Sequence, residues 1–361
     1  MTSQPAPAVA AQQTSDETGP GGPASASGNP EAASVSDGSA HGASPPDDAA
    51  PDHAAADGTR PAGSIAATLV LALLTVGWLG LLILSVLAVL TAATDGVLAV
   101  TETAYGLPAV IFAALVAGAG VAQAVVRLTD RRLAAAPVLR LAAATVTGVV
   151  VGSGAAAGVV FGDGRGGSAV TILGWALFAG AVTGAVLAGL HRRAGLLTAA
   201  ATAAALAVAV LTTSRELAKG PLLELFGAGD TPVSVLTAQT RLVWASALLA
   251  GAVAGLVAFG YLHRALRRAG QTLPWPAYLA VGAGPGGLLL VAEVITRVGG
   301  SQLLGLARSF SESDDTFQTM ANAGRINSAL VILFAGAFTA LICLGRTLPG
   351  RADSDTGTDT D

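Results

Sequence analysis

Long apolar runs alternate with short polar segments over most of the chain, and they set the fold class. A helix needs about 20 apolar residues to cross a bilayer, and lipid offers no partners for an open sheet edge, so runs of this length predict helices. Eight runs qualify, at residues 65–93, 107–127, 138–161, 169–190, 196–213, 241–262, 277–298 and 326–345. The pattern predicts an all-α polytopic transmembrane helical bundle of about eight spans.

The fifth run is the weakest, because Ala and Thr favour membrane insertion less than Leu or Ile does. Keeping it as a span places most arginines on one side of the bilayer, which short cytoplasmic loops favour. That side receives Arg60, Arg127, Arg131, Arg132, Arg140, Arg192, Arg193, Arg264, Arg267, Arg268, Arg346 and Arg351. The other side holds Arg165, Arg215, Lys219, Arg241, Arg297, Arg308 and Arg325. We therefore expect eight spans with both termini in the cytoplasm.

The polar ends of the chain predict three regions. Residues 1–63 are acidic and rich in Ala, Gly, Pro and Ser, and residues 347–361 are again acidic. Such segments bury too little apolar surface to offset their ordering entropy, so both are expected to be disordered tails flanking a transmembrane domain at 64–346. We expect the first apolar run, at residue 65, to be an uncleaved anchor rather than a signal peptide.

Composition agrees with a membrane protein and excludes several other classes. The chain is 52% hydrophobic and 12% charged, with a mean hydropathy of +0.64, whereas soluble domains have about a quarter of their residues charged. Arginines scattered in twos and threes argue against nucleic-acid binding. The single cysteine, Cys343, lies in an apolar run and forms neither an intrachain disulfide nor a thiolate metal site. The Ala/Gly/Val-rich composition is typical of a bacterial source, so the bacterial cytoplasmic membrane is the expected location.

Similar segments recur in four of the runs and suggest repeated helical hairpins. They read LVAGAGVAQAVVR from Leu115, LFAGAVTGAVLAGLHRR from Leu177, LLAGAVAGLVAFGYLHR from Leu248 and LFAGAFTALICLGR from Leu333. The second and third align over eleven residues and are the favoured pair for a duplication. Chance recurrence in an Ala/Gly-rich chain is the alternative.

Pairs of glycines four residues apart predict close helix packing. They are Gly148 and Gly152, Gly154 and Gly158, Gly180 and Gly184, and Gly251 and Gly255. The packing is either within the chain or between copies of it, so a homo-oligomer or a membrane-protein partner remains open beside the lipid bilayer itself.

The seventh run carries the first candidate functional residues, Gly284 and Pro285, in the sequence GAGPGG. Pro285 removes a helical hydrogen bond beside flexible glycines, which predicts either a broken helix or a kink satisfied by its neighbours. A broken helix at membrane depth exposes backbone groups that bind substrates or ions. The GxGxxG spacing found here and at 162–167 lacks the strand-to-helix context of a nucleotide site.

Glu293 and Arg297 are the second pair of candidates for a substrate or ion pathway. They lie four residues apart on one predicted helix face and can form an ion pair. Ionisable residues inside a span indicate function, but the alternative is an interfacial anchor, because both lie near the end of the run.

His191 and Arg192, and likewise His263 and Arg264, end two of the runs at matching depth. Basic residues at this position predict contacts with anionic lipid headgroups. A metal site is disfavoured because no carboxylate or cysteine stands at ligand spacing. The sequence gives no reason to expect a cofactor.

The two longest polar segments, 214–240 and 299–325, are expected to contain short interfacial helices. Their apolar residues are Leu222, Leu223, Leu225 and Phe226 in the first segment, and Leu303, Leu306, Ala307 and Phe310 in the second. The acidic residues Glu312, Asp314 and Asp315 predict a solvated loop.

Three functions fit this pattern. The favoured one is a permease-like protein that moves a small solute or ion. The second is a non-transporting scaffold or accessory subunit of a membrane complex, and the third, weaker one is a lipid-processing enzyme. Catalytic residues are not predicted, because the common protease, hydrolase and ATPase motifs are missing from the sequence.

Overall fold

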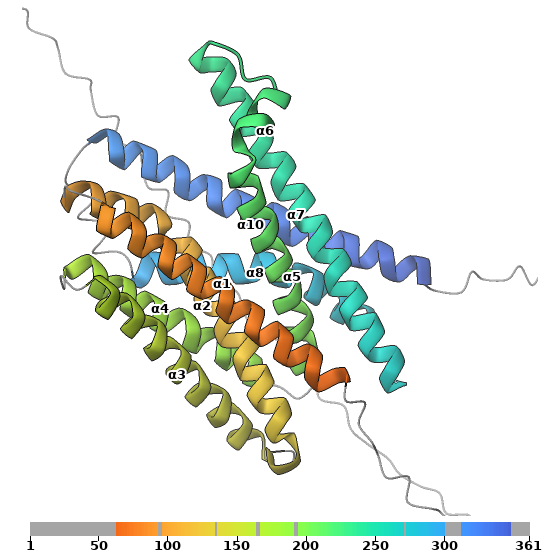
Figure 1. The fold of residues 1–361 in the computed structure, drawn as a ribbon. Coiled ribbons are helices and arrows are strands. Elements are labelled where there is room, and N and C mark those ends of the chain that lie inside the picture. The colour runs from red at the N-terminus through yellow and green to blue at the C-terminus, as the bar shows by residue number, and fades with distance from the viewer. Residues whose placement is uncertain are drawn as a thin grey trace, which may run out of the picture. The chain divides into compact units, whose positions relative to one another are not determined.

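The computed structural model describes the backbone of residues 63–92, 96–133, 136–163, 167–190, 194–270, 272–299 and 312–347 (Figure 1). Side-chain surroundings are described within these ranges, in helices α2 and α10 from residues 104 and 323 onward. The predicted tails, His191, Arg192 and the segment Leu303–Phe310 lie outside the described residues.

The described residues form α-helices and no strand, which confirms the all-α prediction. The helices are α1 (Gly63–Ala92), α2 (Gly96–Leu133), α3 (Pro137–Asp163), α4 (Ser168–Gly189), α5 (Ala194–Leu217), α6 (Lys219–Leu225), α7 (Pro232–Ala269), α8 (Trp275–Gly299) and α10 (Glu312–Thr347). All except α6 are long and apolar enough to cross a membrane. The eight predicted runs each correspond to one of these long helices, and the chain is a multi-pass membrane protein.

Several helices extend well beyond the predicted runs. Helix α7 was expected at 241–262 and α10 at 326–345, yet α7 begins at Pro232 and α10 at Glu312. Hydropathy finds the part of a helix that lies in lipid, whereas backbone hydrogen bonding continues into water as long as no breaker intervenes. The acidic residues from Glu312 onward therefore begin a helix and are not the predicted loop.

Local signals mark both ends of α7. The Thr231 side chain accepts a hydrogen bond from the Ser234 backbone N–H, and Pro232 occupies the first turn. Gly270 ends the helix in the left-handed conformation, with φ of 60°. The short helix α6 precedes this cap, as the apolar cluster at Leu222–Phe226 predicted.

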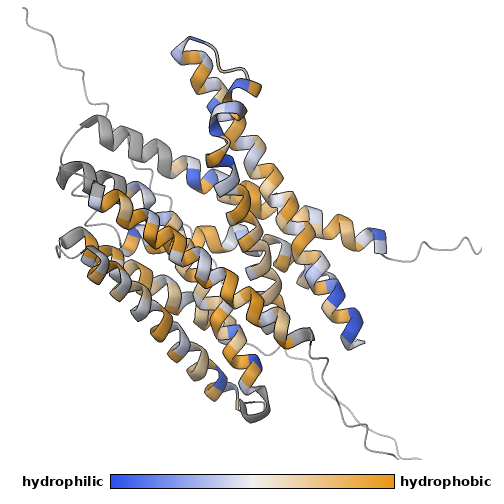
Figure 2. Cartoon of the chain, in the orientation of Figure 1, coloured by the Kyte–Doolittle hydropathy of each residue, from blue (hydrophilic) through white to orange (hydrophobic). Residues whose placement is uncertain are grey.

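Hydrophobic residues occupy most of each long helix (Figure 2), and many of their side chains lie on the outside of the bundle rather than in its core. Leu73 and Leu81 on α1, Val150 on α3, Trp175 on α4 and Phe338 on α10 are among the large hydrophobic residues that stay exposed. Water would penalise such a surface, and lipid does not, so the observation supports a bilayer environment. Helix α2 is the most enclosed: 78% of the residues in an apolar 18-residue stretch of its span are buried, compared with 22% in such a stretch of α1.

The long helices form two groups of four, α1–α4 and α5 with α7, α8 and α10. In the first group α4 packs on α2 and α3, and in the second α10 packs on α7 and α8. The group cores are largely separate, one centred on Ile111 and Leu177, the other on Ala254 and Leu262. The groups meet mainly where α2 and α4 contact α5 and α8.

In each group, two glycines four residues apart on one helix lie directly against a neighbouring helix. On α3, Gly148 and Gly152 face α4 near Ala181 and Phe178, and on α8, Gly282 and Gly286 face α10 near Gly336 and Leu333. The α4 and α10 segments that start at Leu177 and Leu333 both begin LFAGA. Gly180 and Gly184 on α4 face α2, and Gly251 and Gly255 on α7 likewise face α10. The duplication that the sequence favours, of α4 with α7, stays a prediction.

Candidate functional site

The two sides of the bundle are named here by landmarks. The start of α1 and the end of α7, at Arg267, lie on one side, whereas α6 lies on the other (Figure 1). They are called the Arg267 side and the α6 side. Helix α8 begins on the Arg267 side and ends on the α6 side, so Glu293 and Arg297 lie toward the α6 side.

Glu293 is the centre of an ion-pair cluster. Its carboxylate is 7% exposed and accepts a hydrogen bond from Arg297 Nε on the next turn of α8 at 3.2 Å, as predicted from the spacing. Its second oxygen accepts from Arg325 Nε on α10, also at 3.2 Å. The neighbouring residues Ala292 and Thr296 are buried. The cluster therefore ties α8 to α10 through a buried acid and two partly exposed arginines.

Arg325 was missed as a candidate in the sequence. It had been placed in a polar segment before the last span, and only the extension of α10 to Glu312 puts it on a helix beside α8. The available signal was a lone arginine just outside an apolar run, which is common at membrane interfaces and so not specific.

Helix α8 is continuous from Trp275 to Gly299, with Pro285 inside it. The predicted break is therefore wrong, and the alternative of a proline accommodated by neighbours holds. A Cβ on Gly282 or Gly286 would overlap α10, and one on Gly284 would lie 2.7 Å from the Ala201 side chain on α5. These close contacts hold the helix on both sides of Pro285, which is itself buried.

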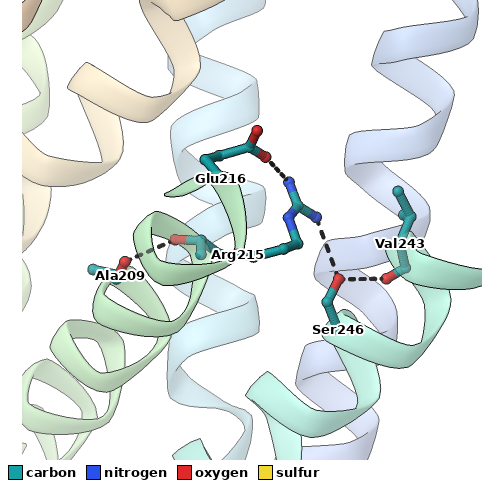
Figure 3. Close-up of polar contacts among 6 residues, drawn as sticks. Ala209, Arg215, Glu216, Val243 and Ser246 are labelled. Atoms are coloured by element: carbon teal, nitrogen blue, oxygen red, sulfur yellow. Dashed lines mark hydrogen bonds and ion pairs between the residues drawn. The ribbon is translucent and has the colours of Figure 1, made fainter. Parts of the chain in front are cut away.

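A second polar link joins α5 and α7 on the α6 side (Figure 3). Arg215 on α5 donates from Nη1 to the Ser246 hydroxyl at 3.2 Å and pairs through Nη2 with the adjacent Glu216. Ser246 in turn donates to the Val243 carbonyl at 2.9 Å. Arg215 thus fixes the end of α5 against α7 just before the chain turns into α6.

The interior also contains neutral polar groups that the sequence analysis did not single out. Gln123 on α2 is 2% exposed, and its Nε2 donates to the Thr202 hydroxyl on α5 at 3.3 Å. This bond crosses between the two helix groups. The signal for Gln123 was a lone amide within the apolar run AGAGVAQAVV, and Thr202 had none, because α5 contains several threonines.

The basic end of α7 presents a stacked histidine. The His263 ring lies parallel to Phe259, with centroids 5.2 Å apart, and Phe259 also contacts Tyr278 on α8. Arg264, Arg267 and Arg268 are exposed around it. Within the described residues, His, Cys, Asp and Glu side chains do not gather in threes as a metal site would need.

Comparison with known proteins adds no family, because the chain matches neither a protein-family model nor a curated protein nor a solved structure.

Proposed function

We propose that this multi-pass protein is permease-like and moves a small solute or ion between its two groups of four helices. The observation that supports this is the division of the bundle into two groups with largely separate cores, whose helices contact one another less extensively than they contact helices of their own group. Groups that pack more closely within themselves than with each other can rock as units, which is how many transporters alternate access.

The pathway candidates from the sequence fit this proposal to different degrees. Glu293 is a buried acid on α8, a helix that contacts both groups, and the adjacent Ala292 packs into the core of the first group. Arg297 and Arg325 form ion pairs with the Glu293 carboxylate. Gly284 and Pro285 are proposed to let α8 bend as the groups move, because Pro285 leaves the Val281 carbonyl without its regular helical donor.

Reconstitution tests the proposal directly. Purified protein in liposomes should give flux of at least one solute above protein-free liposomes when ions, sugars, polyols, amides and amino acids are supplied in turn. Absence of both flux and solute-dependent thermal stabilisation over that panel would overturn it.

We further propose that the Arg267 side is cytoplasmic in a bacterial inner membrane, with both termini on that side. The asymmetric placement of arginine supports it, since cytoplasmic loops collect basic residues. At this side His263 and Arg264 are proposed to hold anionic lipid headgroups, and the same role is proposed for His191 and Arg192, which follow α4 in the sequence. Phosphatidylglycerol should then raise the midpoint of thermal unfolding for the wild type more than for Arg264→Gln; equal shifts would refute the contact.

A non-transporting scaffold is the second candidate, and the continuous helix α8 favours it. Gly282 and Gly286 bring α8 into backbone contact with α10, so this part of the bundle is tightly closed rather than open to a broken-helix site. A scaffold should carry a partner at fixed stoichiometry through purification in mild detergent. Repeated purification of the chain alone would count against it.

A further inference from the structure

The bond between Gln123 and Thr202 is the starting point, because it lies deep in the bundle between the two helix groups. Gln123 is six residues from the end of the α2 span at Thr129, about 9 Å at 1.5 Å per residue. Thr202 is six residues from the start of the α5 span at Leu196. Both are almost completely buried, and Thr202 also donates to the Thr198 carbonyl at 2.7 Å.

The other half of the Gln123 amide has no partner among the described residues. Its Oε1 is buried and accepts no hydrogen bond. Exchanging the amide oxygen and nitrogen does not remove the problem, because the Thr202 hydroxyl already donates to Thr198 and Nε2 would then be the unpartnered atom. Such a group inside a bilayer-spanning bundle is destabilising unless something binds it.

Thr75 on α1 adds a third neutral polar group. It is fully buried, and its hydroxyl donates to the Ala72 carbonyl at 2.9 Å. A Cβ on Gly120 of α2 would lie 2.6 Å from the Thr75 hydroxyl oxygen, so Thr75 lies against α2 one helical turn from Gln123. We name Thr75, Gln123 and Thr202 the Gln123 seam.

We propose that the Gln123 seam is the solute-binding position of the permease and takes a small neutral solute that donates an O–H or N–H to Gln123 Oε1. The inference rests on the proposed function and names its substrate class. The seam carries no formal charge that would match an ion. An unpartnered carbonyl oxygen calls for a donor, and the adjacent Nε2–H group repels a cation.

The thermal stability of a Gln123 variant shows whether this residue binds a solute or only holds the fold together. If Gln123 served only to hold α2 on α5, replacing it would weaken the fold. A leucine at this position removes the unpartnered oxygen and leaves Thr202 bonded to Thr198, so Gln123→Leu should unfold at a temperature a few degrees higher. A residue that lowers stability and is needed for flux is typical of a functional site.

The experiment measures glycerol and urea entry into proteoliposomes by light scattering, together with thermal unfolding. Gln123→Leu should lower the wild-type permeability by about tenfold and Thr202→Val by about threefold, as expected for one lost hydrogen bond or part of one. The matched controls are Gln239→Leu, at an exposed glutamine of α7, and Thr145→Val, a threonine of α3 with the same type of bond to its own helix. Both should keep wild-type permeability.

The outcomes distinguish this site from the proposed function. If wild-type protein moves glycerol, urea or another solute and Gln123→Leu moves it equally well, the seam holds only a trapped water and the site is wrong while transport stands. If the wild type moves only charged solutes, the substrate class is wrong. If it moves nothing over the broad panel, both proposals fail. If Gln123→Leu unfolds at a lower temperature than the wild type, the permeabilities of Thr202→Val and Thr145→Val test the site instead. A loss of permeability in Thr202→Val alone supports the site, and equal permeability in the two variants refutes it.

Discussion

Arg325 on α10 donates from Nε to Glu293 Oε2 on α8 at 3.2 Å, and so joins two helices through residues 32 positions apart in the sequence. The bond fixes how α8 lies on α10 toward the α6 side. The glycine contacts between these helices, at Gly282 and Gly286, lie earlier along α8. The Glu293 side chain is 7% exposed, and so its charge depends on the two arginines rather than on water.

Glu293→Gln should destabilise the protein more than Arg297→Gln does. Glu293→Gln removes both ion pairs of the buried acid but leaves arginines that water reaches, since their side chains are 52% and 30% exposed, so it should cost about 1–2 kcal/mol in the free energy of unfolding. Arg297→Gln removes only the more exposed pair and should cost less than about 1 kcal/mol. Thermal unfolding in detergent compares the two variants. Equal midpoints would show that the cluster does not hold α8 on α10.

The same variants test the pathway role of Glu293. If the carboxylate only anchors the helix, an Arg297→Gln protein that folds normally keeps full flux, and so does any Glu293→Gln protein that remains folded. Loss of flux in folded Glu293→Gln supports the pathway role. Wild-type flux in both variants would remove Glu293 and Arg297 from the pathway.

Two glycines with the same GxxxG spacing should respond oppositely to alanine. Gly184 on α4 lies against the Leu115 carbonyl of α2, where a Cβ would overlap backbone, so Gly184→Ala should lower the free energy of unfolding by several kcal/mol, about the effect of overpacking a core. Gly158 on α3 has nothing within 4 Å of an added Cβ, and Gly158→Ala should raise stability by about 0.5–1 kcal/mol through helix propensity.

A larger substitution at Gly158 tests whether the protein associates with a second copy of itself. If α3 packs against a second copy through Gly154 and Gly158, Gly158→Leu should lower the apparent mass in cross-linking or native mass spectrometry. An unchanged mass would leave only the packing within the chain, which Gly148, Gly152, Gly180 and Gly184 already perform.

Membrane orientation is testable with single cysteines. In a background where Cys343 is replaced by Ala, Arg267→Cys should resist a membrane-impermeant maleimide in intact cells, and Asp230→Cys between α6 and α7 should react. Both positions are exposed, so reactivity reports the side of the membrane. Labelling of residue 267 from outside would reverse the topology and the headgroup role proposed for His263.

Apolar run length predicted the helical class, because lipid requires each spanning segment to satisfy its own backbone hydrogen bonds. Run length, with the placement of the arginines for the weak fifth run, also predicted the eight spans. The spacing of Glu293 and Arg297 similarly predicted their ion pair, since residues four apart share a helix face. These are local properties, and local sequence is sufficient for them.

Tertiary packing decided the rest. Whether Pro285 breaks α8 depends on the helices that enclose it, and α10 and α5 hold it closed. Arg325 and Gln123 acquired their roles only from partners on other helices. In a bundle whose helices are all apolar and rich in Ala and Gly, the sequence determines that helices cross the bilayer, whereas shape complementarity between their surfaces determines which of them meet.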